Sequence, residues 1–163
     1  MARSVFFSFH YENDINRAMV VRNSWITKGI QEAGFKDKAA FEQVKRQGDQ
    51  AVYNWIDRQL EGTSVTVVLI GSETLTRPFV HYEICQSLKR GNAVIGVYIS
   101  GVKDMITQFT SERGNPHTII GHYSDKSPAY FDVVADGIYD YIAGNGYANM
   151  GAWIEAAAKQ HGK

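Results

Sequence analysis

The sequence predicts an α/β protein in which a central, mostly parallel sheet carries helices on both faces. Two observations favour this class. The run from Ser64 to Ile70 is nearly continuous in apolar and β-branched residues, which is typical of a parallel strand covered on both sides. Runs of this kind alternate with segments of helical periodicity, as a parallel sheet requires. The 163 residues suit a single domain, 1–163, that can bury about two-thirds of its unfolded surface.

The amino-terminal part of the chain predicts a strand, a helix and a second, short strand. Val5 to Phe9 forms the first strand. A helix is expected between a capping residue, Asp14, and a terminating glycine, Gly34. Its apolar positions recur at helical spacing: Ile15, Ala18, Met19, Ile26, Ile30 and Ala33. Phe35 then begins the short second strand.

The next segment, Lys36 to Gln47, is polar and charged, and its length predicts a functional loop rather than a tight turn. Asp49 opens a helix that ends at Gly62. The apolar face of this helix consists of Val52, Trp55, Ile56 and Leu60. The central strand Ser64 to Ile70 follows, and Ser72 to Arg77 turns the chain.

A helix from Pro78 to Arg90 comes next, because proline fits a first helical turn and Gly91 follows the end. Ala93 to Ile99 is a further apolar strand. The stretch from Ser100 to Lys126 has no clear period, apart from Thr118-Ile119-Ile120, which is a candidate fifth strand.

Two helices are predicted at the carboxyl-terminal end. Ser127 and Pro128 fit the cap and first position of a helix that Gly144 closes. Its apolar positions are Phe131, Val134, Ile138, Tyr141 and Ile142. The last helix runs from about Ala148 to Lys159, with Met150, Trp153, Ile154 and Ala157 at helical spacing.

Composition argues against several classes of function. Seventeen basic and seventeen acidic residues cancel, so no overall attraction to nucleic acid or to an anionic membrane is expected. Cys85 is the only cysteine, which excludes an intramolecular disulfide and a thiolate zinc cluster. No apolar run has the length of a membrane span or the form of a signal peptide. These features predict a soluble, cytoplasmic protein.

Common motifs for phosphate binding and catalysis are absent from the sequence. The turn after the first strand contains no glycine, so there is neither a dinucleotide fingerprint nor a P-loop. The central strand ends in Ile70-Gly71-Ser72, without the aspartate of a phospho-acceptor receiver domain. The five histidines lack the paired spacing of a zinc site, and no serine lies in a nucleophile elbow.

One carboxylate is the strongest candidate for chemistry. Glu83 lies in the segment Phe79-Val80-His81-Tyr82-Glu83-Ile84, in the opening turns of the helix that follows the central strand. Ligands of open α/β sheets bind in the crevice beyond the carboxyl ends of the strands. Glu83 is expected at the edge of the inward stripe of this helix, and therefore half sheltered. A solvated surface glutamate is the alternative.

His10 ends the first strand at the same edge of the sheet. With Tyr11 beside it, His10 could contact the phosphate or a ring of a ligand, although an ordinary surface histidine fits the sequence equally well. Side chains alternate along this strand, so Phe7 and Phe9 share one face while Phe6, Ser8 and His10 share the other. The phenylalanines are expected in the core.

A lone carboxylate suffices for one type of glycosidic cleavage. Ordinary glycosidases need two carboxyl groups, because one must protonate the leaving oxygen. Nicotinamide leaves the ribose of NAD from a pyridinium and departs neutral, without a proton. A single carboxylate can then stabilise the oxocarbenium ion and orient the ribose hydroxyls.

The sequence resembles the Toll/interleukin receptor (TIR) domain family, and within it the bacterial TIR-like ThsB subgroup of the Thoeris antiphage system. Ser4-Val5-Phe6-Phe7-Ser8-Phe9 is similar to the first-strand box of the family, and the Glu83 segment to its catalytic helix motif. The runs VFFSFHYEND, VVRNSWITK, GTSVTVVLIGSET and KRGNAVIGVYI are similar in content and order. The core motifs lie in residues 1–103, and residues 104–163 are the family-variable part.

The resemblance implies a flavodoxin-like (TIR) three-layer sandwich of about five strands and an NAD-consuming enzyme of antiphage defence, an NAD+ glycohydrolase or ADP-ribosyl cyclase. NAD would be the substrate, with no cofactor and no metal. A phage-derived trigger would start synthesis of a cyclic ADP-ribose isomer or a related ADP-ribosyl signal. This diffusible nucleotide would activate a separate effector. Self-association on activation is expected, without nucleic acid or membrane as a partner.

The resemblance also implies roles for individual residues. Glu83 matches the catalytic glutamate, and the residues matching those that line the nucleotide pocket are Phe6, Ser8, His10 and Tyr11. Asp37 and Phe41 fall in the loop that in TIR domains closes over substrate or pairs with a neighbour. Phe79 occupies the position where the helix motif often has tryptophan, so the resemblance does not fix the shape of the pocket.

Two other functions stay open at this point. One is a non-enzymatic TIR scaffold that signals by homotypic association, with Glu83 as a surface residue. The other is a flavodoxin-like binder of another nucleotide, which the missing phosphate loop disfavours.

Overall fold

Five parallel strands form the central layer, in the order β2-β1-β3-β4-β7. The structure, a computed structural model, describes residues 4–26, 32–33 and 38–163. The strands are β1 (Val5–Ser8), β2 (Glu32–Ala33), β3 (Val65–Ile70), β4 (Ala93–Tyr98) and β7 (Gly137–Asp140). This order is that of a flavodoxin-like sheet, so the predicted fold class is confirmed.

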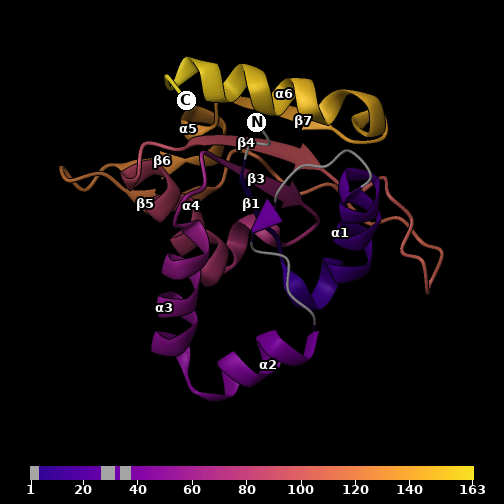
Figure 1. Cartoon of the computed structure of the whole chain (residues 1–163), viewed down its shortest axis with the longest axis horizontal. Coiled ribbons are helices and arrows are strands. Elements are labelled where there is room, and N and C mark those ends of the chain that lie inside the picture. Colours follow the sequence, from indigo (N-terminus) through magenta and orange to yellow (C-terminus); the bar gives the residue numbers. More distant parts are fainter. Residues whose placement is uncertain (1–3, 27–31, 34–37) are drawn as a thin grey trace.

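Helices cover both faces of the sheet, as predicted. On one face lie α1 (Tyr11–Ile26) and α6 (Gly146–Gln160), whose apolar residues share a core cluster with the sheet. On the other lie α3 (Asp49–Leu60) and α4 (Pro78–Lys89). Figure 1 shows α6 on one side of the strands, with α3 and α4 on the opposite side.

The central strand β3 shows why its sequence is continuously apolar. All six of its residues are buried. Val65, Val67 and Leu69 pack in the cluster with α1 and α6, whereas Val68 and Ile70 pack against α4. Since successive side chains point to opposite faces, a strand covered on both sides needs an apolar residue at each position.

The predicted helices on the α3/α4 face are confirmed to within a residue or two. Gly62 and Gly91, just beyond the ends of α3 and α4, have φ of 77° and 75°. Glycine adopts these left-handed conformations without the steric penalty of a side chain, which explains why both helices end at these positions.

The boundaries of α1 differ from the prediction at both ends. The helix begins at Tyr11, so Asp14 is not its cap. The Asp14 side chain is 1% exposed and accepts a hydrogen bond from Arg17 Nη1 at 3.2 Å. Its carboxylate therefore pairs with Arg17 instead of capping the helix. Ala33, predicted as helical, belongs to β2. Phe35, predicted to begin the second strand, lies outside the described residues.

The loop predicted from Lys36 to Gln47 is wrong, because Lys38–Arg46 is a helix, α2. Its sequence, KAAFEQVKR, consists largely of residues with high helix propensity, and Lys45 and Arg46 favour its last turn. Val44 packs against the cluster that Phe6 forms with α3. Polarity suggested a loop, but it reflects one solvated face of this helix.

The helix predicted from Pro128 to Gly144 is also wrong. This segment forms β6 (Pro128–Tyr130), the short helix α5 (Phe131–Val134) and the edge strand β7. Phe131 is fully buried, and its ring comes within 2.8 Å of the position that a Cβ would take at Gly96 of β4. Ile138 of β7 pairs with the same Gly96. Because Phe131 and Ile138 both lie against Gly96, residues 128–144 form separate short elements instead of one continuous helix.

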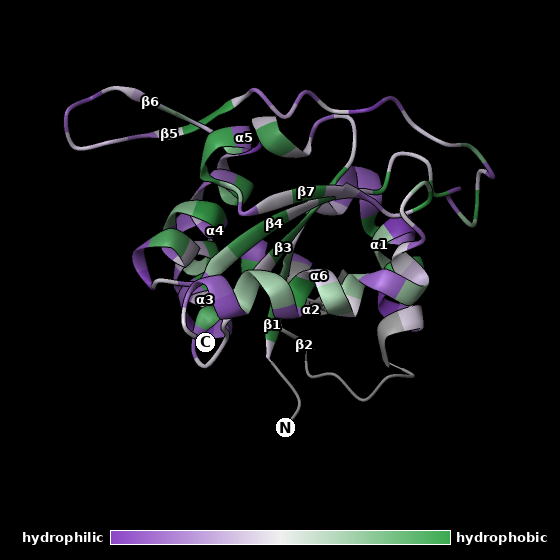
Figure 2. Cartoon of the chain, turned by 90° about the horizontal axis from the view of Figure 1, so that it is seen from above, coloured by the Kyte–Doolittle hydropathy of each residue, from purple (hydrophilic) through white to green (hydrophobic). Residues whose placement is uncertain are grey.

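The candidate strand at Thr118-Ile119-Ile120 is real but does not join the central sheet. Strand β5 (Ile119–His122) pairs with β6 in an antiparallel, two-stranded sheet. Figure 2 shows this hairpin projecting away from the parallel strands. The remaining helix is a 3-10 turn, η1 (Thr74–Thr76). Within the described residues, no helix combines the length and apolar character needed to cross a bilayer.

Candidate active site

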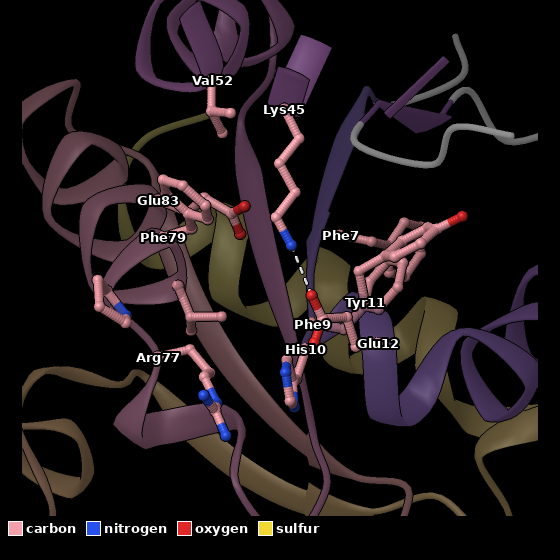
Figure 3. Close-up of a pocket in the computed structure, with 12 residues that line it drawn as sticks. Phe7, Phe9, His10, Tyr11, Glu12, Lys45, Val52, Arg77, Phe79 and Glu83 are labelled. Carbon is pink, nitrogen blue, oxygen red and sulfur yellow. Dashed lines mark hydrogen bonds and ion pairs between the residues drawn. The ribbon is translucent and has the colours of Figure 1, made fainter. Parts of the chain in front are cut away.

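A cleft opens at the carboxyl ends of β1 and β3 (Figure 3). From these neighbouring strands α1 and α4 depart to opposite faces of the sheet, which is the topological position where open α/β sheets bind ligands. The cleft has a volume of about 190 Å³. The residues that line it are Phe7, Phe9, His10, Tyr11, Glu12, Lys45, Val52, Arg77, Pro78, Phe79, Val80 and Glu83.

The turn from β3 into α4 positions Glu83. Arg77 is extended, with φ −88° and ψ 131°, as the residue before a proline prefers, and Pro78 starts the helix. Glu83 follows in the second turn and is 8% exposed. Figure 3 shows its carboxylate directed into the cleft. Glu83 is therefore more sheltered than predicted and is not a solvated surface residue.

Contacts between α3 and α4 hold this helix in place. The Tyr82 hydroxyl donates to both carboxylate oxygens of Asp57, at 3.0 and 2.9 Å. Tyr53 packs edge-on against Phe79, with ring centroids 5.5 Å apart. Behind Glu83, Ser87 donates to its carbonyl oxygen at 2.6 Å. These contacts fix the backbone from which the Glu83 carboxylate projects.

The opposite wall comes from the end of β1 and the start of α1. Phe9 and Tyr11 stack with their ring centroids 6.3 Å apart. His10 lies between them in sequence, and its Nδ1 atom is buried without a hydrogen-bond partner among the described residues. Burial, reinforced by the Arg77 charge, lowers the pKa of His10 below 6.5. His10 is therefore neutral at physiological pH.

Two ion pairs lie at the mouth of the cleft. Lys45 of α2 contacts Glu12 of α1 at 2.5 Å, and its hydrogen bond lowers the pKa of Glu12. Arg77 contacts Glu73 at 3.1 Å, and Asn13 donates to Glu73 at 2.6 Å. Hydrogen bonds from Asn13 and Arg77 lower the pKa of Glu73. The mouth is thus charged, whereas Val52, Phe79 and Val80 make an apolar wall beside Glu83.

The structure brings together three of the predicted site residues: Glu83, His10 and Tyr11 all line the cleft. Phe6 instead packs in the core with α3, and Ser8 is fully buried and absent from the lining. Their binding roles stay predictions.

The two remaining predicted residues have no described side chains. Asp37 lies outside the described residues. Phe41 belongs to α2, but its side chain lies outside the described part of the structure.

Sequence reasoning missed the charged residues of the mouth. Lys45 falls in the segment predicted as a loop, and no residue near it in sequence indicates a contact with Glu12, which is 33 residues away. The position of Arg77 in the sequence does indicate that it lies near the site, because Arg77 directly precedes the proline that begins the Glu83 helix. No group of three or more metal-ligating side chains occurs among the residues that the structure describes.

Lowering the pH is expected to destabilise the protein partly through His10. The pKa of His10 is lower in the folded state than its ordinary value, so between these two values the unfolded chain binds more protons. The free energy of unfolding should therefore fall as the pH is lowered from about 7.5 to 5.5. Urea titrations should show a smaller fall for His10→Gln than for wild type. Equal falls in both, with exposed His122→Gln as the control, would contradict this assignment.

Comparison with known proteins gives a family match and a curated relative. Residues 6–104 match the family described as "Thoeris protein ThsB, TIR-like domain". A protein of Bacillus cereus (strain MSX-D12), named "Putative cyclic ADP-D-ribose synthase ThsB1", is 34% identical to this chain over an alignment of 191 positions. The alignment covers 94% of this chain and 100% of that protein.

Proposed function

We propose, because the chain belongs to the ThsB family of TIR-like domains, that it cleaves the bond between nicotinamide and ribose in NAD and makes a cyclic ADP-ribose isomer or a related ADP-ribosyl signal. The observation that carries this proposal is the placement of Glu83. Its carboxylate is 8% exposed and faces a cleft at the switch point of the sheet.

The chemistry requires only one carboxylate. As the C1′–N bond breaks, its electron pair passes to the pyridinium nitrogen, and nicotinamide leaves as a neutral base. The ribose becomes an oxocarbenium ion, which the negative charge of Glu83 stabilises. A ribose hydroxyl that attacks C1′ and releases its proton gives a cyclic product, whereas water gives a linear one. The apolar wall of Val52, Phe79 and Val80 supports cyclisation because it limits access of water.

The size of the cleft supports binding of one end of NAD. Its volume of about 190 Å³ is below the roughly 300–1,000 Å³ of sites that enclose a whole drug-sized ligand. The nicotinamide riboside end fits beside Glu83, and the rest of the dinucleotide then extends across the charged mouth.

The proposal extends to the biological setting. A phage-derived trigger activates the protein in the cytoplasm, with self-association as part of activation. The nucleotide product diffuses to a separate effector. NAD acts as substrate, and no cofactor takes part.

Small molecules produced during infection test this function. Cells that carry the chain are infected with phage, and their extracts are compared with those of uninfected cells by mass spectrometry. We expect free nicotinamide to rise and an ADP-ribosyl product to appear only after infection. Concentrated purified protein incubated with NAD provides a direct assay. A non-enzymatic scaffold would leave NAD and its products unchanged in both experiments.

A further inference from the structure

Four charged side chains lie near His10 at the mouth of the cleft. Lys45 and Glu12 lie on α2 and α1, and Arg77 and Glu73 flank η1. All four are near enough to His10 to act on it electrostatically. Lys45, Glu12 and Arg77 also line the cleft. The cluster therefore belongs to the entrance of the site rather than to a remote surface.

Among the described residues, each of the two cations lies in an exposed ion pair. The side chains of Lys45 and Glu12 are 46% and 64% exposed, and those of Arg77 and Glu73 are 40% and 50% exposed. Exposed pairs of this kind contribute little to stability and are weakened by salt. A ligand with a higher charge density can therefore displace the carboxylates.

Unused hydrogen-bonding capacity points to such a ligand. Arg77 contacts Glu73 through Nη2, while its Nε atom is buried without a hydrogen-bond partner among the described residues. A guanidinium can donate two parallel hydrogen bonds to one phosphate group. The pair with Glu73 thus leaves part of the Arg77 donor set unused, and a phosphate would use it.

The geometry points to Lys45 and Arg77 as a pair that binds the diphosphate of a nucleotide. When no nucleotide is bound, Glu12 and Glu73 pair with these two cations, and they therefore compete with the diphosphate for them. This inference rests on the proposed function, and it adds which residues determine the affinity of the protein for the nucleotide. The nicotinamide riboside end lies beside Glu83, and the diphosphate replaces the two carboxylates at the mouth. Figure 3 shows Lys45 and Arg77 on different sides of the cleft.

Binding of ADP-ribose, measured by isothermal titration calorimetry at low salt, tests the inference. Lys45→Gln and Arg77→Gln should each weaken binding roughly tenfold, because each loses a charged hydrogen bond. Glu12→Gln should strengthen binding about two- to fivefold, because Lys45 no longer has a competing partner. Glu112→Gln, at an exposed position outside the cleft, removes the same charge and should change nothing.

The competition has a signature that a general charge effect lacks. The gain from Glu12→Gln should vanish in a Lys45→Gln background, because the two residues act through one contact. Binding of nicotinamide riboside, which has no phosphate, should be unchanged in all variants. An undiminished gain without Lys45, an equal gain in Glu112→Gln, or no binding of ADP-ribose to wild type would overturn the inference. If the variants behave as expected but NAD is never cleaved, the enzymatic proposal fails and the diphosphate site stands.

Discussion

Replacing Glu83 with Gln is expected to slow nicotinamide release from NAD by at least about 100-fold, which is the usual scale for loss of a group that stabilises transition-state charge. Glutamine has nearly the same shape as glutamate, so the packing of α4 should survive. It carries no negative charge, however, and cannot stabilise the oxocarbenium ion. The loss should appear in kcat, since the charge is needed most in the transition state.

Three measurements separate loss of chemistry from loss of structure. The thermal unfolding of Glu83→Gln should match that of wild type, and ADP-ribose should bind within a few-fold of the wild-type affinity. Glu112→Gln, which removes an exposed carboxylate outside the cleft, should retain full activity. Wild-type rates of nicotinamide release from Glu83→Gln would remove Glu83 from the mechanism. Intact antiphage signalling by the same variant would favour the scaffold.

The layers of the fold were predictable because local patterns agree with the tertiary structure on the α3/α4 face. Strand β3 is apolar at each position since it is buried on both sides, and α3 and α4 end at glycines with positive φ. Glu83 was predictable for a related reason. It follows the central strand in sequence, and a residue at the start of the next helix must lie near the carboxyl edge of the sheet.

The carboxyl-terminal region was not predictable because its pattern fits two structures. The apolar residues from Phe131 to Ile142 have helical spacing, yet they are divided between α5, β7 and the turn that follows β7. The structure that this segment adopts depends on Gly96, which is far away in sequence. Gly96 leaves room for the Phe131 ring and pairs with Ile138. A single sequence does not show which residues will meet across such a distance.

Sequence patterns predict the location of Glu83 and His10 at the cleft, but not the location of the charged residues at its mouth. The alternation of side chains along β1 correctly places Phe6 and Phe7 on opposite faces of the sheet. It does not show which residues of the strand border the cleft. The Lys45–Glu12 pair depends on α2, whose residue Val44 packs against the Phe6 cluster. That contact is tertiary, and the polar composition of α2 concealed it.

Gly71→Ala should be the most destabilising of the small substitutions near the site, at a cost of roughly 2–4 kcal/mol. A Cβ at Gly71 would lie 2.1 Å from Asp14 Oδ2 and 2.6 Å from its Cγ. The effect is steric alone, because the φ of Gly71 lies outside the left-handed region. Its N–H donates to Thr74 Oγ1 at 2.8 Å, which ties the backbone to η1.

Asp14 cannot easily move aside for the new methyl group. Its carboxylate is 1% exposed, and Arg17 donates to Oδ1 at 3.2 Å. Arg17 is itself held, because it also donates to the carbonyl oxygens of Val102 and Phe109, both at 2.9 Å. Displacing Asp14 would therefore disturb the contact between α1 and the segment after β4.

Urea denaturation of four proteins tests this explanation: wild type, Gly71→Ala, Asp14→Ala and the double variant. Asp14→Ala alone should be destabilising, since Arg17 loses its buried partner. Adding Gly71→Ala to that background should cost much less than in wild type, because the clashing carboxylate is gone. Gly101→Ala is the matched control, as its Cβ would meet only the Ile142 side chain, at 3.3 Å.

The same variants show whether this contact also shapes the cleft. Asp14 is one helical turn from Tyr11 and close to Glu12, so its packing against Gly71 sets where α1 begins relative to β3. Gly71→Ala should therefore weaken ADP-ribose binding at temperatures where the protein stays folded, and the double variant should recover part of the affinity. A stable Gly71→Ala protein with unchanged binding would show that Asp14 adjusts freely and that α1 is not fixed by this contact.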